Sequence, residues 1–509
     1  MTPARNRMRI TRTLTLTILA GLVASLAVEA AAQPRTCGPP PQATPQRRTA
    51  AESLPPLPLP ATPLRRTERK RQPSPPALVG KVILGEVKWM TRDGQRYSYR
   101  DWMTDPNDIA NLLGWTNRQL GIHYRPVDTD LPQFSFNPTE LPILYFTGHD
   151  AFTVPDALLP RLRQFCIDGG TIWGDACCGS PEMDKAFRAF AAKLFPRRPL
   201  QSLAMDHPLY SSFYHISTVR YKRGEEEWAD KPCLEAVHIG CRATVIYGGG
   251  YDLSCGWDGH IHDHGQRVLP RDARQLGANM ITYALATYEL GRFLSTDRVY
   301  HQKGEPTRDQ LVIAQVVHDG DWDTQPSSLA ALLKHLARNT TVAVQFKREV
   351  VDLRSIDAFA HPILYMTGHK EFTLTDDEVN NLRRYLAAGG VLVANACCGR
   401  RTFDDAFRRE IKRVLPDHSL TRIGLDHPVY RSIYPIQQVD YTPLVRHEQP
   451  GLEAPTLEGI SLENQLRVIY SPIGLVNGWS GAPNPYARGY ESDDALRLGI
   501  NILVYAMTH

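Results

Sequence analysis

Asp175-Ala176-Cys177-Cys178-Gly179 is the stretch that decides the fold, because the same turn returns 220 residues later as Asn395-Ala396-Cys397-Cys398-Gly399. Each copy follows a Gly-Gly pair and an apolar run, at 169–174 and at 389–394. Such a run after a glycine pair is typical of a buried strand. The paired cysteines are therefore expected at the end of a strand in both halves of the chain.

A helix start follows each cysteine pair. Ser180 before Pro181 fits an N-cap with proline at the first helical position. In the second copy, Thr402 with Asp405 three residues later resembles a capping box. The cysteines thus lie on a predicted strand-to-helix turn, which is where open α/β sheets bind their ligands.

Two further motifs recur at the same offset of 220. One ends an apolar strand and comprises Thr147, Gly148 and His149, repeated as Thr367, Gly368 and His369. The other is Asp206-His207-Pro208, repeated as Asp426-His427-Pro428. Because strands alternate with helical patterns in both halves, we predict an α/β fold. It consists of two tandem doubly wound, flavodoxin-like domains with mostly parallel sheets.

The predicted organisation has four parts. Residues 1–32 have the basic, apolar and small-residue regions of a signal peptide, cleaved before Gln33, and an uncleaved anchor is the alternative. Residues 33–78 contain 13 prolines and few aliphatic residues, which is typical of a disordered linker. The two repeats follow at 79–300 and 301–509, and we expect the first strand to begin at Leu84. Beyond the signal, no segment is long and apolar enough to span a bilayer, so we expect an exported, periplasmic or envelope-associated protein.

The charge of the chain is unevenly distributed. Residues 1–78 hold 12 basic and 3 acidic residues, whereas the rest of the chain holds 46 basic and 51 acidic ones. The folded part is therefore slightly acidic, which argues against a nucleic-acid partner. Of the nine cysteines, only Cys397 and Cys398 lie in the second repeat, so a disulfide framework cannot hold that repeat together.

The sequence resembles the bacterial domain-of-unknown-function family 4159 over roughly 85–300 and 310–509. The pattern comprises the strand ending in Thr-Gly-His, the Gly-Gly strand, a short acidic or cysteine-bearing turn, Phe-Asp-x-x-Phe-Arg, and Asp-His-Pro before an aromatic residue. Phe403-Asp404 and Phe407-Arg408 fit, whereas the first copy has Met183 in place of the first phenylalanine. The resemblance implies a class I glutamine amidotransferase-like fold, distantly similar to the trehalose-utilisation family, and it implies no reaction. Many relatives are membrane-anchored, and this chain departs from them in its export signal and proline-rich spacer.

The cysteine pairs are the first candidates for chemistry. Cys178 and Cys398 lie closest to the helix starts, where a thiol can act as a nucleophile beside a histidine such as His149 or His369. A vicinal disulfide, a soft-metal site and simple packing in a tight turn are the alternatives, and packing is favoured. Cys178 within hydrogen-bond reach of His149 and partly exposed would indicate an enzyme, whereas burial of both pairs would argue against one.

The histidines offer further candidates. His149 and His369 could serve as a base or ligand, or bond to loop carbonyls. We expect Asp206 and its counterpart to fix a turn with their side chains, although a His-Asp dyad is an alternative. The alternating residues His260, His262 and His264 could ligate zinc or copper in the first repeat alone, against a solvated loop. No cofactor is predicted.

These observations favour a protein that binds a small polar molecule, a glycan or an envelope protein at the carboxyl ends of the strands. The predicted binding residues are Thr147, Gly148, His149, Cys177, Cys178, Asp206, His207, Thr367, Gly368, His369, Cys397, Cys398, Asp426 and His427. The alternative is a cysteine- or metal-dependent hydrolase of sugars or amides, with His149, Cys178 and His207 converging. Its candidate catalytic residues, counting both copies, are His149, Cys178, His207, His369, Cys398 and His427. A self-pairing scaffold is a third possibility.

Overall fold

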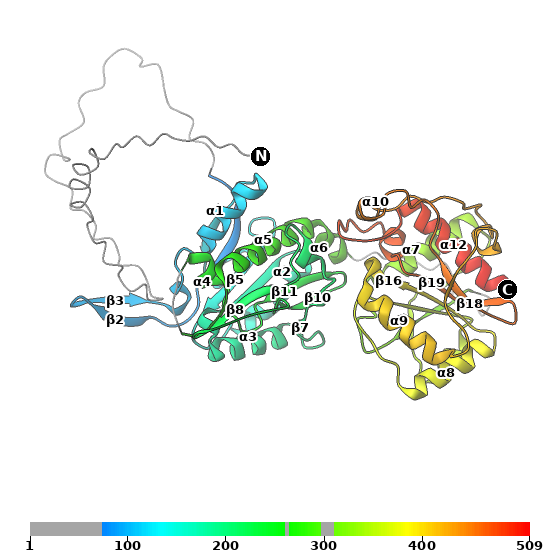
Figure 1. Cartoon of the computed structure of the whole chain (residues 1–509), viewed down its shortest axis with the longest axis horizontal. Coiled ribbons are helices and arrows are strands. Elements are labelled where there is room, and N and C mark those ends of the chain that lie inside the picture. The colour runs from blue at the N-terminus through cyan, green and yellow to red at the C-terminus, as the bar shows by residue number, and fades with distance from the viewer. Residues whose placement is uncertain (1–73, 260–263, 297–309) are drawn as a thin grey trace, which may run out of the picture.

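Two seven-stranded sheets, one in each half of the chain, form the centre of the protein (Figure 1). The computed structural model describes residues 74–259, 264–296 and 310–509. The predicted signal peptide, nearly all of the predicted linker, and His260 and His262 therefore lie outside the described residues.

The first domain contains strands, helices and short 3-10 turns in an alternating order. Its strands are β1 (Ala77–Val82), β2 (Lys88–Arg92), β3 (Gln95–Tyr99), β4 (Arg125–Thr129), β5 (Ile143–Gly148), β6 (Thr171–Ala176), β7 (Gln201–Ser202), β8 (Val219–Arg223), β9 (Glu226–Asp230), β10 (Glu235–Ile239), β11 (Arg242–Tyr247) and β12 (Gln266–Val268). Its helices are α1 (Asp108–Leu120), α2 (Leu159–Ile167), α3 (Pro181–Leu194), α4 (Ser254–Asp258), α5 (Pro270–Ala286) and α6 (Tyr288–Ser295). The 3-10 turns that matter below are η2 (Asp101–Met103), η5 (Cys177–Gly179) and η6 (Pro208–Ser211).

The second domain repeats this order in a shorter form. Its strands are β13 (Ile313–Val317), β14 (Glu349–Asp352), β15 (Ile363–Gly368), β16 (Val391–Ala396), β17 (Thr421–Arg422), β18 (Glu458–Leu462) and β19 (Gln465–Ser471). Its helices are α7 (Ser328–Asn339), α8 (Asp376–Ala387), α9 (Arg401–Val414), α10 (Pro443–Glu448), α11 (Val476–Ser480) and α12 (Ser492–Thr508). The corresponding 3-10 turns include η8 (Cys397–Gly399) and η9 (Pro428–Tyr430).

The strand order confirms the predicted fold class. The first sheet runs β4-β1-β5-β6-β11-β10-β7 and the second β14-β13-β15-β16-β19-β18-β17. In both sheets the first five strands are mutually parallel, and the last two strand pairings are antiparallel, so that only β10 and β18 run against the other strands. The parallel part has the 2-1-3-4-5 order of a doubly wound sheet, in which ligands bind at the carboxyl ends of the strands.

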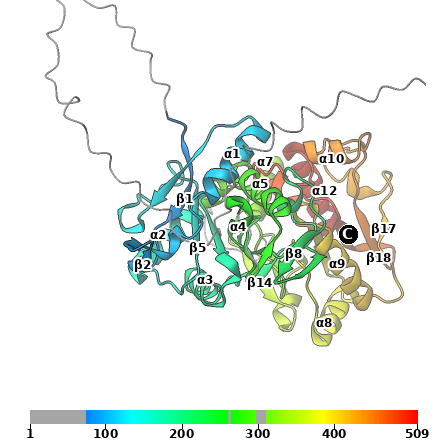
Figure 2. The ribbon, with the colours of Figure 1, turned by 60° about the vertical axis from the view of Figure 1, so that its left-hand side comes forward.

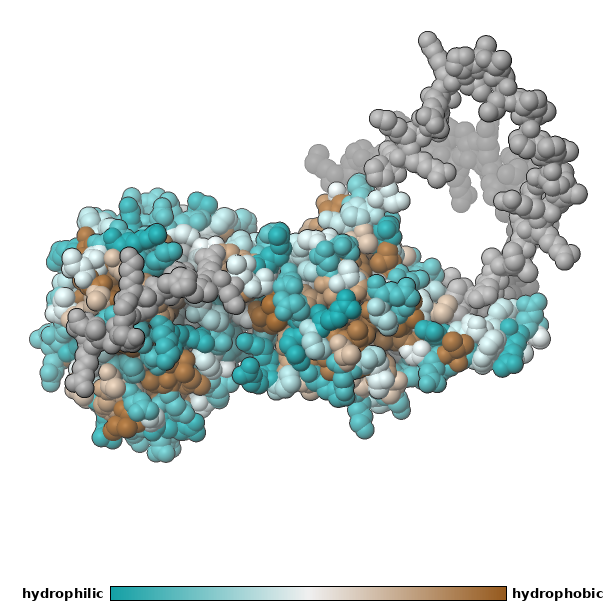
Figure 3. Space-filling model, turned by 180° about the vertical axis from the view of Figure 1, so that it is seen from behind, coloured by the Kyte–Doolittle hydropathy of each residue, from teal (hydrophilic) through white to brown (hydrophobic). Residues whose placement is uncertain are grey.

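Each sheet is buried on both faces, as its sequence pattern requires. In β5, Ile143 and Tyr145 pack into the core beneath α1 and α5, whereas Leu144 and Phe146 pack into the core beneath α2 and α3. Both Figure 1 and Figure 2 show α1 and α5 on the opposite side of the first sheet from α3. The face seen in Figure 3 is mostly hydrophilic, with hydrophobic residues in small separate patches.

The predicted position of the first strand is wrong. The first sheet strand begins at Ala77, inside the last residues assigned to the linker, and the stretch after Leu84 instead leads into the β2–β3 hairpin. Among the described residues of the second domain, 310–509, no hairpin corresponds to it. None of the helices in the described part of the chain is long and apolar enough to cross a membrane.

The two predicted helix caps have different outcomes. Ser180 caps α3 as expected, because its side chain accepts the Met183 N–H at 3.3 Å. Thr402 does not form a capping box in α9. Its hydroxyl donates to Asp206 Oδ1 at 2.9 Å and its backbone N–H to Asp206 Oδ2 at 3.2 Å. A carboxylate of the first domain therefore caps a helix of the second.

Candidate functional site: two cysteine turns and the cavity between the domains

Both cysteine pairs lie on a strained strand-to-helix turn. Cys178 follows β6 with φ 56° and ψ 13°, and Cys398 follows β16 with φ 56° and ψ 18°. This left-handed conformation is unfavourable for a residue with a side chain, by about 1–2 kcal/mol. Such strain recurs at functional sites, where the surrounding structure enforces it. In the first domain the Cys178 N–H donates to Asp252 Oδ2 at 2.6 Å, which helps to hold the turn.

The first turn faces a histidine that an aspartate orients. Cys178 Sγ lies 3.4 Å from His149 Nε2, and His149 Nδ1 lies 3.5 Å from Asp101 Oδ1. The backbone N–H groups of His149 and Asp150 donate to Asp101 Oδ2 at 2.6 and 2.8 Å. A Cβ on Gly148 would lie 2.2 Å from that same oxygen, which is why glycine precedes the histidine. His149 Nδ1 also lies 3.2 Å from Thr104 Oγ1. Cys178 and His149 are therefore placed as a nucleophile and its base, with Asp101 within ion-pair distance of the ring in the manner of a catalytic triad.

The charges of this triad are coupled. Burial lowers the pKa of His149, but the hydrogen bonds to Asp101 and Cys178 outweigh burial and raise it to about 10. Burial likewise acts to raise the pKa of Asp101, and its bonds with His149 and the backbone lower it overall. His149 is thus positively charged at neutral pH in this geometry.

Access to the first turn is limited. Cys177 is fully buried and Cys178 is 8% exposed, whereas the His149 side chain is 34% exposed. His264 Nε2 lies 3.7 Å from Cys178 Sγ. Of the three predicted metal-ligating histidines, His264 alone falls within the described residues, and it lies against the cysteine turn.

An acidic, cysteine-rich cluster lies behind the triad. Cys177 Sγ lies 3.3 Å from Asp105 Oδ2, and Cys255 Sγ lies 3.6 Å from the same oxygen. Asp252 accepts from the backbone N–H of Cys178 and of Cys255, and burial raises its pKa to about 7. The carboxylates are therefore satisfied by donors from the loops around them.

The second turn repeats the dyad with tighter geometry. His369 Nδ1 lies 2.7 Å from Asp321 Oδ2, and the His369 N–H donates to Asp321 Oδ1 at 2.7 Å. Burial lowers the pKa of His369, but Cys241 and Asp321 raise it well above its ordinary value. Hydrogen bonds from Cys241 and Cys397 hold the pKa of Cys398 well below that of an ordinary thiol. Both shifts arise from the close contacts among Cys241, Cys397, Cys398, His369 and Asp321.

Unlike the first turn, the second is covered by the other domain. Cys241, in the turn between β10 and β11 of the first domain, places its Sγ 3.6 Å from Cys397 Sγ. Cys397 is fully buried, and Cys398 is 4% exposed. The two copies of one motif thus have different environments.

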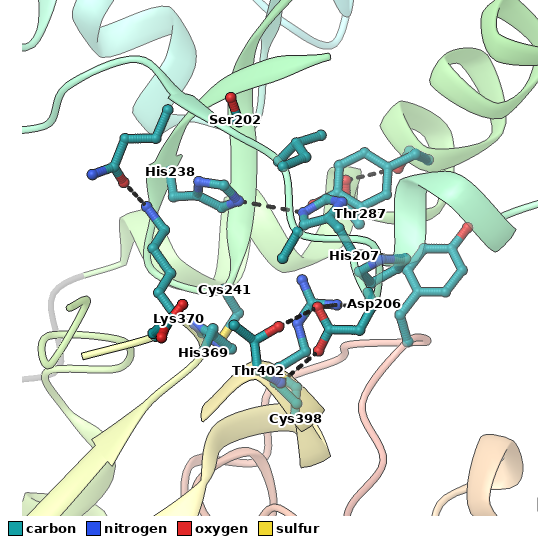
Figure 4. A pocket seen from close by; sticks show the side chains of 18 of the residues that line it. Ser202, Asp206, His207, His238, Cys241, Thr287, His369, Lys370, Cys398 and Thr402 are labelled. Carbon is teal, nitrogen blue, oxygen red and sulfur yellow. Dashed lines mark hydrogen bonds and ion pairs between the residues drawn. The ribbon is translucent and has the colours of Figure 1, made fainter. Parts of the chain in front are cut away.

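A cavity of about 380 Å³ lies between the two domains, beside the second turn (Figure 4). The first domain contributes residues near β7, β10 and η6, and the second contributes residues after β15 and β16. The polar residues that line it include Gln201, Asp206, His207, His238, Lys370 and Arg400. The cavity therefore lies at the carboxyl ends of the second sheet but at the antiparallel edge of the first.

Two histidines of the first domain meet in this cavity. His207 Nδ1 accepts the Leu209 N–H at 3.2 Å, so we assign its hydrogen to Nε2, which lies 3.3 Å from His238 Nε2. Burial, together with nearby Arg400, lowers the pKa of His207 well below 6.5, and burial with Lys370 does the same for His238. Both rings are therefore neutral at pH 7.

A family comparison agrees with the duplication. The model of the family described as "Domain of unknown function (DUF4159)" matches residues 95–285 and 312–507, once in each domain. The chain belongs to the DUF4159 family. No curated protein matches the chain. Among solved structures, alpha-L-fucosidase isoenzyme 2 from Paenibacillus thiaminolyticus is similar at 12% identity and a TM-score of 0.19. That match covers 80% of this chain and 47% of the fucosidase, and it is too weak to support an argument.

The structure brings some of the residues predicted for this DUF4159 chain together and separates others. His149 and Cys178 meet as expected. His207 does not join them, because it lies in the interdomain cavity with residues of the second domain's motif. The prediction that the side chains of Asp206 and Asp426 fix their turns is also wrong. In each turn the histidine does this instead, because Nδ1 of His207 and of His427 accepts the backbone N–H two residues later. The Asp426 side chain is exposed.

Several residues that build these sites were missed. Asp101 and Asp321 orient the histidines, and Asp101-Trp102 recurs as Asp321-Trp322 at the offset of 220, a signal that would have found them. Cys241 and His238 carried no such signal, because the equivalent positions of the second repeat hold Asn464 and Ser461. Only the packing of the two domains reveals their positions.

Proposed function

We propose that this DUF4159 protein is an exported binding protein that holds a small, anionic, sugar-sized molecule in the cavity between its domains and catalyses no reaction. The observation that carries the proposal is the convergence of motifs from both copies on one cavity. Asp206 and His207 of the first copy face His369 and Cys398 of the second. Burial of both cysteine pairs also argues for binding rather than thiol chemistry.

The charges around the cavity favour an anion. Asp206 already accepts from Thr402, and Glu371 is paired with Arg409 at 3.0 Å, so these carboxylates are engaged. Lys370 donates to Gln201, a neutral partner, and burial lowers its pKa. A negatively charged ligand would relieve the cost of burying this ammonium group.

The size and walls of the cavity favour a sugar. Its volume lies at the lower end of the range for small-molecule sites. Tyr283 and Tyr486, which both line it, stack with ring centroids 5.8 Å apart. Aromatic faces combined with a few polar groups suit a sugar that carries a carboxylate or a phosphate.

Calorimetry tests this proposal. We would titrate the protein with glucose 6-phosphate and glucuronate, and with glucose as the neutral control. A hydrogen bond to a charged group contributes about 1.5–3 kcal/mol, so Lys370→Gln should weaken binding of the anionic probes by about 10–150-fold. Lys347→Gln is the matched control, because Lys347 is exposed and lies outside the cavity. Equal affinity for glucose and the anions, or no effect of Lys370→Gln, would contradict the proposal.

Export is part of the same proposal. The signal-like composition of residues 1–32 and the proline-rich spacer support it. Fractionation of cells, followed by mass spectrometry of the mature N-terminus, should find a periplasmic or envelope protein that begins at Gln33. An N-terminus still at Met1 in the cytosolic fraction would exclude export.

The geometry of Cys178 supports a second candidate, a thiol-dependent hydrolase centred on the first turn. The connectivity of Cys178, His149 and Asp101 is the specific observation that favours it. Alkylation with iodoacetamide, read peptide by peptide, separates the two functions. Fast labelling of Cys178 that His149→Gln slows would favour the hydrolase. The binding proposal expects no labelling until the protein is denatured.

A further inference from the structure

Four metal-ligating side chains from two domains meet beneath the second cysteine turn. They are Cys241 of the first domain and His369, Cys397 and Cys398 of the second, and their ligand atoms all lie within 4.8 Å of one another. Three of the four are buried, and Cys241 is partly buried. Three thiols and one imidazole form one of the standard donor sets of structural zinc sites.

The distances between the sulfurs fit a tetrahedral ion. Zinc–sulfur bonds of about 2.3 Å place two sulfurs of a tetrahedron about 3.8 Å apart. Cys397 Sγ lies 3.8 Å from Cys398 Sγ, and Cys241 Sγ lies 3.6 Å from Cys397 Sγ. A disulfide would require about 2.05 Å, so the sulfurs are not bonded, and their spacing is compatible with a shared ion.

The histidine supplies an independent observation. His369 donates through Nδ1 to Asp321, which leaves Nε2 as its ligand atom. This Nε2 is buried and has no hydrogen-bond partner within the part of the chain that the structure describes, and His369 is only 7% exposed. Metal-bound histidines nearly always donate their other ring N–H to a carboxylate or carbonyl. Asp321 is therefore in the place of an outer-shell partner, and Nε2 is left as the coordinating nitrogen.

The sulfurs also have outer-shell donors. Asn477 Nδ2 and Asn484 Nδ2 lie 3.2 and 3.3 Å from Cys398 Sγ, and Gln325 Nε2 lies 3.2 Å from Cys241 Sγ. Amide donors of this kind stabilise the charge of metal-bound thiolates.

The first turn provides a contrast. Its equivalent cluster is Cys177, Cys178, Asp252 and Cys255, all from one domain. Asp252 already accepts from Ser254 and from the N–H groups of Cys178 and Cys255. Its carboxylate is therefore satisfied without an ion, whereas His369 Nε2 is not.

We propose that Cys241, His369, Cys397 and Cys398 bind one zinc ion, which links the first domain to the second. Four protein ligands leave no open position, so the site is structural rather than catalytic. It borders the cavity described above but does not depend on a ligand there.

Metal analysis of the full chain, produced with zinc in the medium, tests the site. We expect one zinc per chain at this cluster, and Cys241→Ser and His369→Gln should each lower the zinc content by one equivalent. Cys233→Ser is the matched control, because Cys233 is a partly buried cysteine of the first domain outside both clusters. Absence of zinc from the wild type, or zinc content unchanged by Cys241→Ser, would overturn the proposal.

Two measurements keep the test decisive if a variant folds poorly. Cobalt-substituted wild-type protein should show the visible bands of tetrahedral cobalt and the near-ultraviolet bands of thiolate ligation, and their absence would overturn the site. A chelator should also lower the melting temperature of the wild type and of Cys233→Ser, because a bound metal stabilises the folded state. Melting temperatures that the chelator leaves unchanged would count against a structural ion.

Discussion

The contact between Asp206 and α9 gives the sharpest prediction about how the domains are held together. Asp206 caps the helix by accepting from the Thr402 N–H and hydroxyl, and Arg400 donates to its backbone oxygen. Loss of a cap costs about 1 kcal/mol, and loss of hydrogen bonds to a charged group costs about 1.5–3 kcal/mol. The cap is made by these same hydrogen bonds, so the two costs are not added together. We therefore expect Asp206→Ala to destabilise the second domain by about 2–3 kcal/mol.

The second copy of the Asp-His-Pro motif supplies a control variant. Asp426 occupies the equivalent position in the second copy, where it is exposed. For a domain of about 200 residues, a loss of 2–3 kcal/mol lowers the melting temperature by about 4–12 °C. Scanning calorimetry should show this shift for Asp206→Ala and almost none for Asp426→Ala. Equal melting temperatures for the two variants would refute the idea that the first domain caps a helix of the second.

Two further predictions concern pH and helix capping. The pKa values of His207 and His238 are lowered in the folded state, so the unfolded chain takes up protons first and stability should fall as the pH drops below about 6.5. Urea denaturation between pH 7.5 and 5.5 measures this loss of stability, and His238→Gln should make it smaller. If the stability of the wild type and of the variant fell equally with pH, the histidine pair would be excluded as the source of the loss. Ser180→Ala removes the N-cap of α3 and should cost about 1 kcal/mol in the same assay, whereas a loss near zero would mean that the cap contributes little.

The packing around the Phe-Asp-x-x-Phe-Arg motif explains why its residues recur in both copies. Arg408 pairs with Asp404 and with Glu458 on β18, and Tyr470 donates to Asp404 at 2.7 Å. The first copy has the same arrangement. The motif therefore fastens a helix to its sheet, and we assign it no part in ligand binding.

The sequence by itself determined the duplicated α/β fold, because that information is local and periodic. Gly-Gly pairs, apolar strands and helix caps at a fixed offset are sufficient to define two doubly wound sheets. They also put His149 and Cys178 at the same sheet edge, since the carboxyl ends of parallel strands lie together.

Only the tertiary structure decided how the two copies differ. His207 and Cys241 belong to the first repeat in sequence, yet they lie against the second cysteine turn because the antiparallel edge of one sheet packs against the carboxyl edge of the other. Contacts of this kind depend on how two folded surfaces fit together, and no periodicity within either repeat records them. The cavity and the mixed cysteine–histidine cluster therefore follow from domain packing alone.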